Sequence, residues 1–354
     1  MGQNLSDVLS HFLSLKMVTS ISPYGEGHIH ETYLTETINH EPDYILQKIN
    51  QNVFRNIPGM MQNIEAVTRH IQNKLAGLPG HNPDLESLTL VYTKDGQSFY
   101  MGENEDCWRM YVFIPDTFSH QKISELSQAF EAGKAIGFFQ AMLADLDARL
   151  VDTIPDFHNI DFRISQFNQA KIADAAGRVS LVPGDILFVE RRFRPMKSYY
   201  LLLKEKAAVR VTHNDTKVNN VLFDRNNKAL CLIDLDTVMP GYVHFDYGDA
   251  LRTMANTAME DEKDLAKVLF NIEVYRSFTN GYLQAAGSFL NKHEEELLPY
   301  APIYLTFIIG LRFLTDYLNG DIYYRVHHPD HNLERARVQF KLTEEMERAL
   351  NFIF

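Results

Sequence analysis

The chain is poor in cysteine, in positive charge and in long uninterrupted apolar runs. Two cysteines in 354 residues, Cys107 and Cys231, are too few for a disulfide framework, and each begins an apolar stretch, so we expect buried free thiols. Lysine and arginine number 34 against 46 acidic residues, and the net charge of -12 argues against a general binder of nucleic acid or of an anionic membrane. The most apolar segment, residues 300–318, contains Arg312 and Asp316, which predicts a buried helix rather than a membrane span.

The middle of the chain contains two short apolar segments, residues 220–224 and 230–234, and each has a polar loop at one end. The first loop has the spacing H-x-D-x-x-x-x-N, with Asp215 and Asn220 as its last two members, and Asp234 ends the second segment. Each of these residues taken alone is an ordinary turn residue. Their spacing, together with the apolar strands behind both loops, favours the catalytic and metal-binding loops of a kinase.

Phosphoryl transfer needs this set of residue types. One carboxylate must accept the proton of the attacking hydroxyl, and we assign that role to Asp215. An amide oxygen and a second carboxylate hold Mg²⁺ on the phosphates, and we assign these ligands to Asn220 and Asp234. The predicted cofactors are therefore ATP and Mg²⁺.

The N-terminal third offers candidate nucleotide contacts. Gly25 and Gly27 lie in a loop between two strand-like segments, where glycine lets backbone N–H groups approach phosphates closely. Lys48 lies on the next strand and Glu65 on the helix predicted over residues 58–75, in the order of the lysine–glutamate pair of kinases. The other interpretation is a strand lysine facing solvent and a surface helix charge. Within the kinase pattern we favour the ion pair.

Strand patterns fill the first third of the chain and helical patterns most of the rest. A hairpin is predicted around Asp95-Gly96, and Gly133 and Gly137 indicate close helix packing within residues 123–146. The order predicts an α+β, bilobal protein-kinase-like fold with a small β-rich N-lobe and a large helical C-lobe. We expect a nucleotide-binding lobe at residues 1–114 and a catalytic and substrate-binding lobe at residues 115–354.

Arg312 stands on an otherwise apolar helix and needs either a partner or a ligand. Asp316, one turn further on, is a possible structural partner by the i,i+4 rule. A role in binding the substrate is equally compatible with the sequence.

These motifs resemble the aminoglycoside phosphotransferase/choline kinase superfamily and, more narrowly, bacterial N-acetylhexosamine 1-kinases. The resemblance runs from about residue 24 to residue 325. Its narrower part is carried by Thr-Lys after Asp215, by D-L-D-T-V-M-P-G and by R-F-L-T-D-Y-L-N-G-D. It implies a kinase that phosphorylates the anomeric hydroxyl of GlcNAc or GalNAc, with Arg312 and Tyr323 contacting the sugar and Asp249 bracing the catalytic loop. Lys217 is a further predicted substrate contact.

Two other functions stay open. One is a kinase for another small alcohol, such as a different sugar or an amino alcohol. The other is an inactive nucleotide-binding protein, which the presence of Asp215, Asn220 and Asp234 argues against. Residues 1–16 lack the basic start and unbroken apolar core of a signal peptide, so we expect a cytoplasmic protein. The expected partners are a sugar and ATP, with no nucleic acid, membrane or obligate protein partner.

Overall fold

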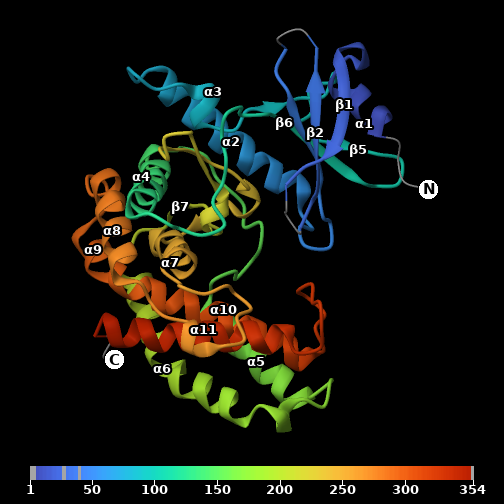
Figure 1. The fold of residues 1–354 in the computed structure, drawn as a ribbon. Helices are drawn as coiled ribbons and strands as arrows, with labels where there is room; N and C mark the ends of the chain where they lie inside the picture. Colours follow the sequence, from blue (N-terminus) through green and yellow to red (C-terminus); the bar gives the residue numbers. More distant parts are fainter. Residues whose placement is uncertain (1–4, 26–28, 39–40, 352–354) are drawn as a thin grey trace. The chain divides into compact units, whose positions relative to one another are not determined.

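The computed structural model describes residues 5–25, 29–38 and 41–351 (Figure 1). These form two compact units, each assembled from three segments of the chain. Unit 1 comprises residues 1–118, 142–154 and 222–240, and unit 2 comprises residues 119–141, 155–221 and 241–354. The lobe boundary predicted between residues 114 and 115 stays a prediction.

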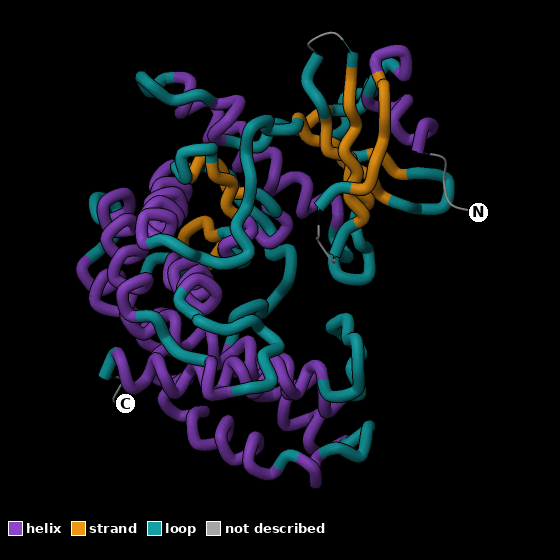
Figure 2. The backbone as a smooth tube through the Cα atoms, in the orientation of Figure 1, coloured by secondary structure: helices purple, strands orange, loops and turns teal. Residues whose placement is uncertain are grey.

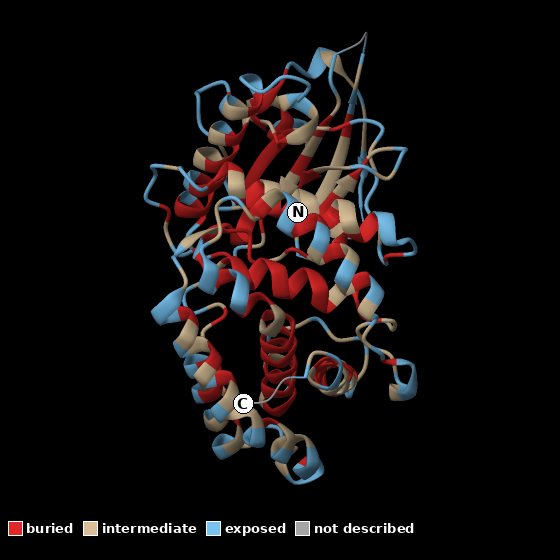
Figure 3. Cartoon of the chain, turned by 90° about the vertical axis from the view of Figure 1, so that its left-hand side faces the viewer, coloured by how far each residue is buried: buried red, intermediate tan, exposed pale blue. Residues whose placement is uncertain are grey.

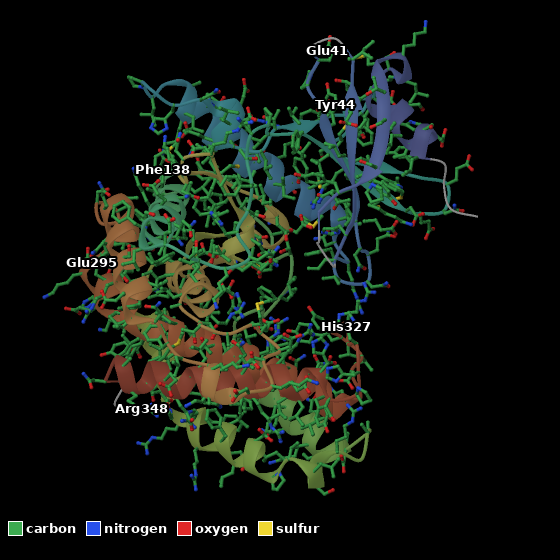
Figure 4. The ribbon with its side chains drawn as sticks, viewed as in Figure 1. Glu41, Tyr44, Phe138, Glu295, His327 and Arg348 are labelled. Carbon is green, nitrogen blue, oxygen red and sulfur yellow. The ribbon has the colours of Figure 1, made fainter. Side chains whose placement is uncertain are left out.

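An antiparallel six-stranded sheet forms the centre of unit 1, with strand order β1-β2-β3-β6-β4 and with β5 also paired to β6 (orange in Figure 2). The strands are β1 (Val18–Pro23), β2 (Glu31–Thr37), β3 (Tyr44–Lys48), β4 (Leu90–Val91), β5 (Tyr100–Met101) and β6 (Cys107–Val112). Helix α1 (Leu5–Phe12) packs on one face of this sheet. The buried cluster there contains Val8, Leu9, Phe12, Leu13, Tyr44, Leu46, Trp108 and Met110. Tyr44 is labelled on the sheet in Figure 4.

Unit 1 also contains helices α2 (Ile57–Ala76) and α3 (Pro83–Glu86) and the strand β9 (Ala229–Leu232), which pairs with β8 (Val221–Phe223) at the start of its last segment. Asn56 caps α2 by accepting a hydrogen bond from the backbone N–H of Gly59 at 3.1 Å. The fully buried amide of Asn63 donates to the carbonyl oxygens of Val151 at 2.8 Å and Val238 at 2.9 Å. These bonds explain why segments distant in sequence belong to this unit.

The hairpin predicted around Asp95-Gly96 is wrong in its pairing. A tight turn is present, because Gly96 has φ +78° and its N–H donates to the carbonyl of Thr93 at 2.8 Å. The flanking strands β4 and β5 are only two residues long, and each pairs with β6 rather than with the other. The turn signal was local, whereas the choice of partner strand depends on the whole sheet.

Unit 2 is mostly helical. Its elements are α4 (Leu126–Met142), α5 (Ile160–Ala173), α6 (Pro183–Lys206), β7 (Arg210–Thr212), α7 (Val243–Met254), α8 (Ile272–Ala286), α9 (Lys292–Leu297), α10 (Ala301–Asn319) and α11 (His331–Ala349); strand β10 (Met239–Gly241) ends at its boundary. Figure 3 shows helices that are buried on one side and exposed on the other. With the small antiparallel sheet of unit 1, this composition confirms the predicted α+β protein-kinase-like fold.

Helix α10 is the core helix of unit 2 and packs against α5, α7 and α11. The stretch Lys292–Asn319 has the length and mean hydropathy (1.6) of a membrane span, but 83% of its apolar window is buried inside the fold. The prediction of a buried helix over residues 300–318 is therefore confirmed.

Glycines bring α4 and α8 into direct backbone contact. A Cβ placed on Gly133 would lie 2.1 Å from the carbonyl oxygen of Phe278, and one on Gly281 would lie 2.0 Å from that of Phe130. A Cβ on Gly137 would lie 2.7 Å from the carbonyl oxygen of Tyr282. The close packing predicted from Gly133 and Gly137 is confirmed.

Candidate active site

The catalytic loop, residues 213–220, follows β7 and is anchored on the first turn of α7. The carboxylate of Asp246 accepts hydrogen bonds from the backbone N–H groups of His213 at 3.0 Å and Asn214 at 2.6 Å. Thr216 Oγ1 donates to the Asp246 carbonyl oxygen at 2.6 Å, and Gln140 Nε2 donates to its carboxylate at 2.8 Å. Asp246 is completely buried, and this burial raises its pKa. The loop therefore has a fixed backbone position relative to α7.

Asp249 lies three residues after Asp246 on α7 and pairs with Arg252, with Oδ1 2.8 Å from Nη2. Its other oxygen, Oδ2, is buried and has no hydrogen-bond partner in the described structure. The bracing of the loop expected from Asp249 stays a prediction. Asp246 and Asp249 both belong to the F-D-Y-G-D string, three residues apart on one helix face, so the sequence did not separate their roles.

Asp215 is held as an ionised carboxylate at the surface of unit 2. Lys217 Nζ lies 2.8 Å from Asp215 Oδ2, and Asn220 Nδ2 donates to the same oxygen at 3.1 Å and to the Asp215 carbonyl at 2.8 Å. Burial favours the neutral acid, but the charge of Lys217 and its hydrogen bond outweigh it, and the pKa of Asp215 lies below its ordinary value. Oδ1 takes part in none of these bonds, and the side chain is 24% exposed. Asp215 can therefore accept a proton from a bound hydroxyl group.

The structure thus brings together three of the residues singled out in the sequence. Asn220 uses its amide N–H on Asp215, so its Oδ1 is the atom that remains to act as a neutral oxygen ligand. Lys217 contacts Asp215. Its predicted contact with the substrate stays a prediction.

A second group of polar side chains lies in unit 1 at the loop after β9. Ligand atoms of His30, Asp234 and Asp236 lie within 4.8 Å of one another. Asp234 has a left-handed backbone (φ 64°, ψ 56°), which is sparsely populated outside glycine and typical of functional positions. Asp236 is almost completely buried and pairs with the buried guanidinium of Arg109.

The donors in this group fit a hard divalent cation. The backbone N–H of Asn50 donates to His30 Nδ1 at 3.1 Å, so Nε2 carries the ring proton and donates to Asp236 Oδ2 at 2.5 Å. His30 therefore has no free lone pair, and the available ligand atoms are carboxylate oxygens. Carboxylate oxygens are the ligands that Mg²⁺ prefers. Asp234, already predicted as a metal ligand, supplies one of these carboxylates, and its predicted role stays a prediction.

Lys48 and Glu65 do not form the predicted ion pair. Lys48 Nζ lies 2.9 Å from Asp106 and 5.9 Å from the centre of the Trp108 ring, whereas Glu65 pairs with Arg69 one turn along α2. The alternation of β3 places Lys48 on the same face as Tyr44 and Leu46, which pack against α1. The predicted contact of Lys48 and Glu65 with the nucleotide stays a prediction.

Of the two predicted glycine contacts, the structure describes one. Gly25 has φ +78°, a conformation that favours glycine, and a Cβ there would meet no atom within 4 Å. Gly27 lies outside the described residues.

Arg312 in unit 2 lies among aromatic side chains rather than beside an acid. Its guanidinium carbon is 4.9 Å from the centre of the Phe157 ring, 5.7 Å from that of Tyr323 and 5.6 Å from that of Tyr324. Its Nη2 lies 3.5 Å from Tyr323 Oη. We call these four residues the acceptor cluster. Arg312 lies on α10 and Phe157 lies just before α5, whereas the two tyrosines belong to the segment after α10, in which Figure 4 labels His327.

Asp316 is not the partner of Arg312. Its carboxylate accepts the backbone N–H groups of Ile322, Tyr323 and Tyr324 at 2.9–3.0 Å, and the amide of Asn332 at 2.9 Å. The structural interpretation of Arg312 as an ion pair with Asp316 is therefore wrong. Asp316 instead holds the backbone that presents Tyr323.

His158 and Arg163 connect the acceptor cluster with the catalytic loop, and the sequence did not reveal either. His158 Nε2 lies 3.3 Å from the carbonyl oxygen of Asn214, next to Asp215. Arg163 donates to the carbonyl oxygen of Phe157, through Nη2 at 2.7 Å and Nε at 3.1 Å. No carboxylate among the described residues pairs with Arg163 or Arg312. Burial and the nearby charge of Arg312 lower the pKa of Arg163 to about 10.

Comparison with known proteins gives the family. A model described as the phosphotransferase enzyme family matches residues 20–278. The chain belongs to this family. This phosphotransferase is accordingly a small-molecule kinase that transfers a phosphoryl group to an alcohol.

Several solved structures share the fold of this chain although their sequences are only 10–16% identical to it. A microcompartment-associated aminopropanol kinase is 16% identical, with a TM-score of 0.65 over 98% of this chain and 97% of that one. An aminoglycoside phosphotransferase from Alicyclobacillus acidocaldarius is 10% identical, with a TM-score of 0.64 over 100% and 98%. A choline kinase from Cryptosporidium parvum is 13% identical, with a TM-score of 0.59 over 98% and 95%. At these identities the likeness concerns the fold alone.

Proposed function

We propose that this phosphotransferase uses ATP and Mg²⁺ to phosphorylate the anomeric hydroxyl of an N-acetylhexosamine, GlcNAc or GalNAc, giving the sugar 1-phosphate. The observation that carries the proposal is the chemistry of the acceptor cluster: it combines the Arg312 guanidinium with the Tyr323 phenol, and no carboxylate among the described residues forms an ion pair with Arg312. The resemblance of the C-terminal motifs to N-acetylhexosamine 1-kinases names the sugar.

Asp215 is the proposed general base. Its ionised form has an uncommitted Oδ1 and lies in a loop whose backbone Asp246 holds in place. Lys217 and Asn220 keep the carboxylate oriented through its other oxygen, Oδ2. A base placed in this way directs the attacking hydroxyl and takes its proton as the bond to phosphorus forms.

Asp234 and Asn220 are the proposed ligands of Mg²⁺, and both can offer an oxygen atom. Bound Mg²⁺ would neutralise the charge on the transferring and leaving phosphate groups. ATP is the proposed phosphoryl donor, which is supported by two relatives of the same fold. A spectinomycin phosphotransferase (13% identical, TM-score 0.54) was solved with ADP, and a streptomycin–ATP complex was solved for another phosphotransferase (15% identical, TM-score 0.55).

The charges near the acceptor cluster favour a neutral acceptor over a cationic one. The Arg312 guanidinium lies over the ring of Phe157, and Arg163 donates a hydrogen bond to the carbonyl oxygen of Phe157. Neither arginine forms an ion pair with a carboxylate among the described residues. A protonated amino alcohol would be repelled there. A neutral sugar instead offers hydroxyl and amide oxygens, which guanidinium and phenol groups bind directionally.

The test is ADP release over a panel of acceptors. We expect activity with GlcNAc and GalNAc, none with their 1-O-methyl glycosides, and little with ethanolamine or aminopropanol. Turnover of a 1-O-methyl glycoside would contradict phosphorylation at the anomeric position. Preference for an amino alcohol over every sugar would overturn the choice of acceptor class and support the alternative of an amino alcohol kinase.

A further inference from the structure

A circuit of side-chain hydrogen bonds in unit 1 joins β2, β3 and β6 to the loop after β9. Gln47 Nε2 donates to Thr32 Oγ1 at 3.1 Å, and Gln47 Oε1 accepts from Arg109 Nε at 3.0 Å. Arg109 Nη1 donates to Asp236 Oδ1, and Asp236 Oδ2 accepts from His30 Nε2 at 2.5 Å. The circuit closes through the backbone, because His30 lies two residues before Thr32. Each donor meets an acceptor, which fixes the orientation of the Gln47 amide.

The circuit lies on the face of the sheet opposite to α1. Gln47 and Arg109 are direct partners in the β3–β6 register, and so are Lys48 and Trp108. Because successive side chains of a strand point to opposite faces, Arg109 lies on one face of the sheet and Lys48 on the other. The basic residue of the sheet that contacts the loop after β9 is therefore Arg109, whose side chain is 1% exposed.

His30 takes part in this circuit as a neutral donor. His30 Nδ1 accepts a hydrogen bond from the Asn50 N–H, and His30 Nε2–H donates one to the Asp236 carboxylate. A ring nitrogen can ligate a metal only through a free lone pair, and neither nitrogen has one. His30, Asp234 and Asp236 are therefore spaced like the ligands of a metal site, but the hydrogen bonds of His30 prevent its imidazole from acting as a ligand.

Asp236 is likewise committed. One oxygen receives Arg109 and the other receives His30, and the side chain is 1% exposed. Asp234, two residues earlier and less buried, is the carboxylate that the proposed function assigns to the cation.

We propose that His30 and Arg109 are positioning residues, which clamp Asp236 from both sides and thereby fix the loop that presents Asp234 to the divalent cation. This inference rests on the proposed function, because it concerns how the Mg²⁺ ligand of that reaction is held. It assigns His30 no direct contact with the metal. Hydrogen-bond partners that orient a metal site in this way typically contribute about 10- to 100-fold in metal affinity.

Two substitutions of His30 separate its hydrogen bonds. In His30→Gln the amide nitrogen reaches the position of Nε2 and keeps the donor to Asp236. In His30→Asn the shorter amide reaches only the position of Nδ1, so the bond to Asn50 is kept and the bond to Asp236 is lost. Arg109→Met would leave a buried carboxylate without its cation and endanger folding, so the His30 pair carries the test.

The readout is Mn²⁺ binding to the full chain in the presence of ADP, measured by the loss of the free Mn²⁺ signal in electron paramagnetic resonance. Circular dichroism and the emission of Trp108, the sole tryptophan, check the fold of each variant. We expect His30→Asn to weaken Mn²⁺ binding about 10-fold or more and His30→Gln to retain the wild-type affinity.

Equal Mn²⁺ affinity of wild type and His30→Asn would overturn the inference. So would Zn²⁺ binding by the wild type that both variants lose, because His30 would then be a ligand itself. If the wild-type protein binds ADP but no Mn²⁺, the metal step of the proposed function fails, and this inference fails with it. The two failures are thus told apart by the wild type alone.

Discussion

His158 donates a hydrogen bond from Nε2 to the carbonyl oxygen of Asn214, the residue before Asp215, over 3.3 Å. A carbonyl oxygen only accepts, so Nε2 carries the proton. The buried Nδ1, which has no hydrogen-bond partner among the described residues, does not. Burial, followed by the charge of Arg312, lowers the pKa of His158 to about 3. His244 is similar: its Nε2 lies 2.8 Å from the carbonyl oxygen of Glu294, and burial lowers its pKa to about 4.

Both histidines should make the protein sensitive to mild acid. In the unfolded chain a histidine takes up a proton near pH 6.5, whereas the folded protein resists protonation until the pH is much lower. The free energy of unfolding should therefore fall by about 1 kcal/mol per pH unit for each histidine as the pH drops below about 6.5. Urea unfolding between about pH 5 and pH 7 measures this slope.

His158→Gln provides the control for acid sensitivity, because its amide nitrogen can keep the donor to Asn214 while the titrating group is removed. Its unfolding free energy should depend less on pH than that of the wild type. An unchanged slope would mean that His158 does not contribute to the acid sensitivity.

Asp215→Asn should lower kcat by ~10²–10⁴-fold, the usual contribution of a general base. The amide cannot accept the proton of the hydroxyl, but it can keep contact with Asn220 and leaves the loop anchored on Asp246. Steady-state kinetics and ADP affinity, measured on the same sample, separate chemistry from binding. Turnover near that of the wild type would remove Asp215 from the role of base.

Arg312 and Asp316 should differ in what their loss does. Arg312→Ala removes a donor from the acceptor cluster and should lower kcat/KM for the hexosamine by about 10- to 100-fold, with ADP affinity and melting temperature little changed. Asp316→Ala leaves three backbone N–H groups without their acceptor and removes one of the two carboxylates to which Asn332 donates, so it should lower the unfolding free energy by about 3 kcal/mol or more. Equal losses of melting temperature in both variants would revive the ion-pair interpretation.

Gly133→Ala should destabilise the protein by about 1–3 kcal/mol or more, because the added methyl group would meet the backbone of α8. Gly184→Ala, near the start of α6, is the matched control. A Cβ there meets no atom within 4 Å, so the higher helix propensity of alanine should leave stability unchanged or slightly raised. Thermal unfolding compares the two, and a Gly133→Ala protein as stable as the control would contradict the close contact of α4 and α8.

Local spacing in the sequence predicted the catalytic loop well. The spacing of Asp215 and Asn220, with four residues between them, places the two side chains within hydrogen-bond distance of each other. The general order of strands and helices was also predictable, because hydrophobic periodicity reflects which face of an element is buried. The place of a residue in the order of motifs did not predict which side chain it would contact. Lys48 has the right place in the order of kinase motifs but shares a face with Leu46, so the alternation of the strand points it at α1.

Contacts between distant segments left no signal in the sequence. His158 meets Asn214 and Arg109 meets Asp236 only because the fold brings the segments together, and residues on either side of them show no pattern that marks the contact. In the sequence, Arg109 is a single charged residue within an otherwise apolar predicted strand. The reason for its burial is visible only in the fold, which places the carboxylate of Asp236 beside it.

The hold of Asp316 on the backbone of residues 322–324 has a consequence for changing acceptor preference by design. Ile322 is 79% exposed and Tyr323 is 54% exposed, although the N–H group of each is bound to a buried carboxylate. The main chain is thus set independently of the side chains that it carries. Mutant libraries that vary positions 322 and 323, and that leave Asp316 and Asn332 intact, should sample new acceptors on an unaltered frame with few unfolded members.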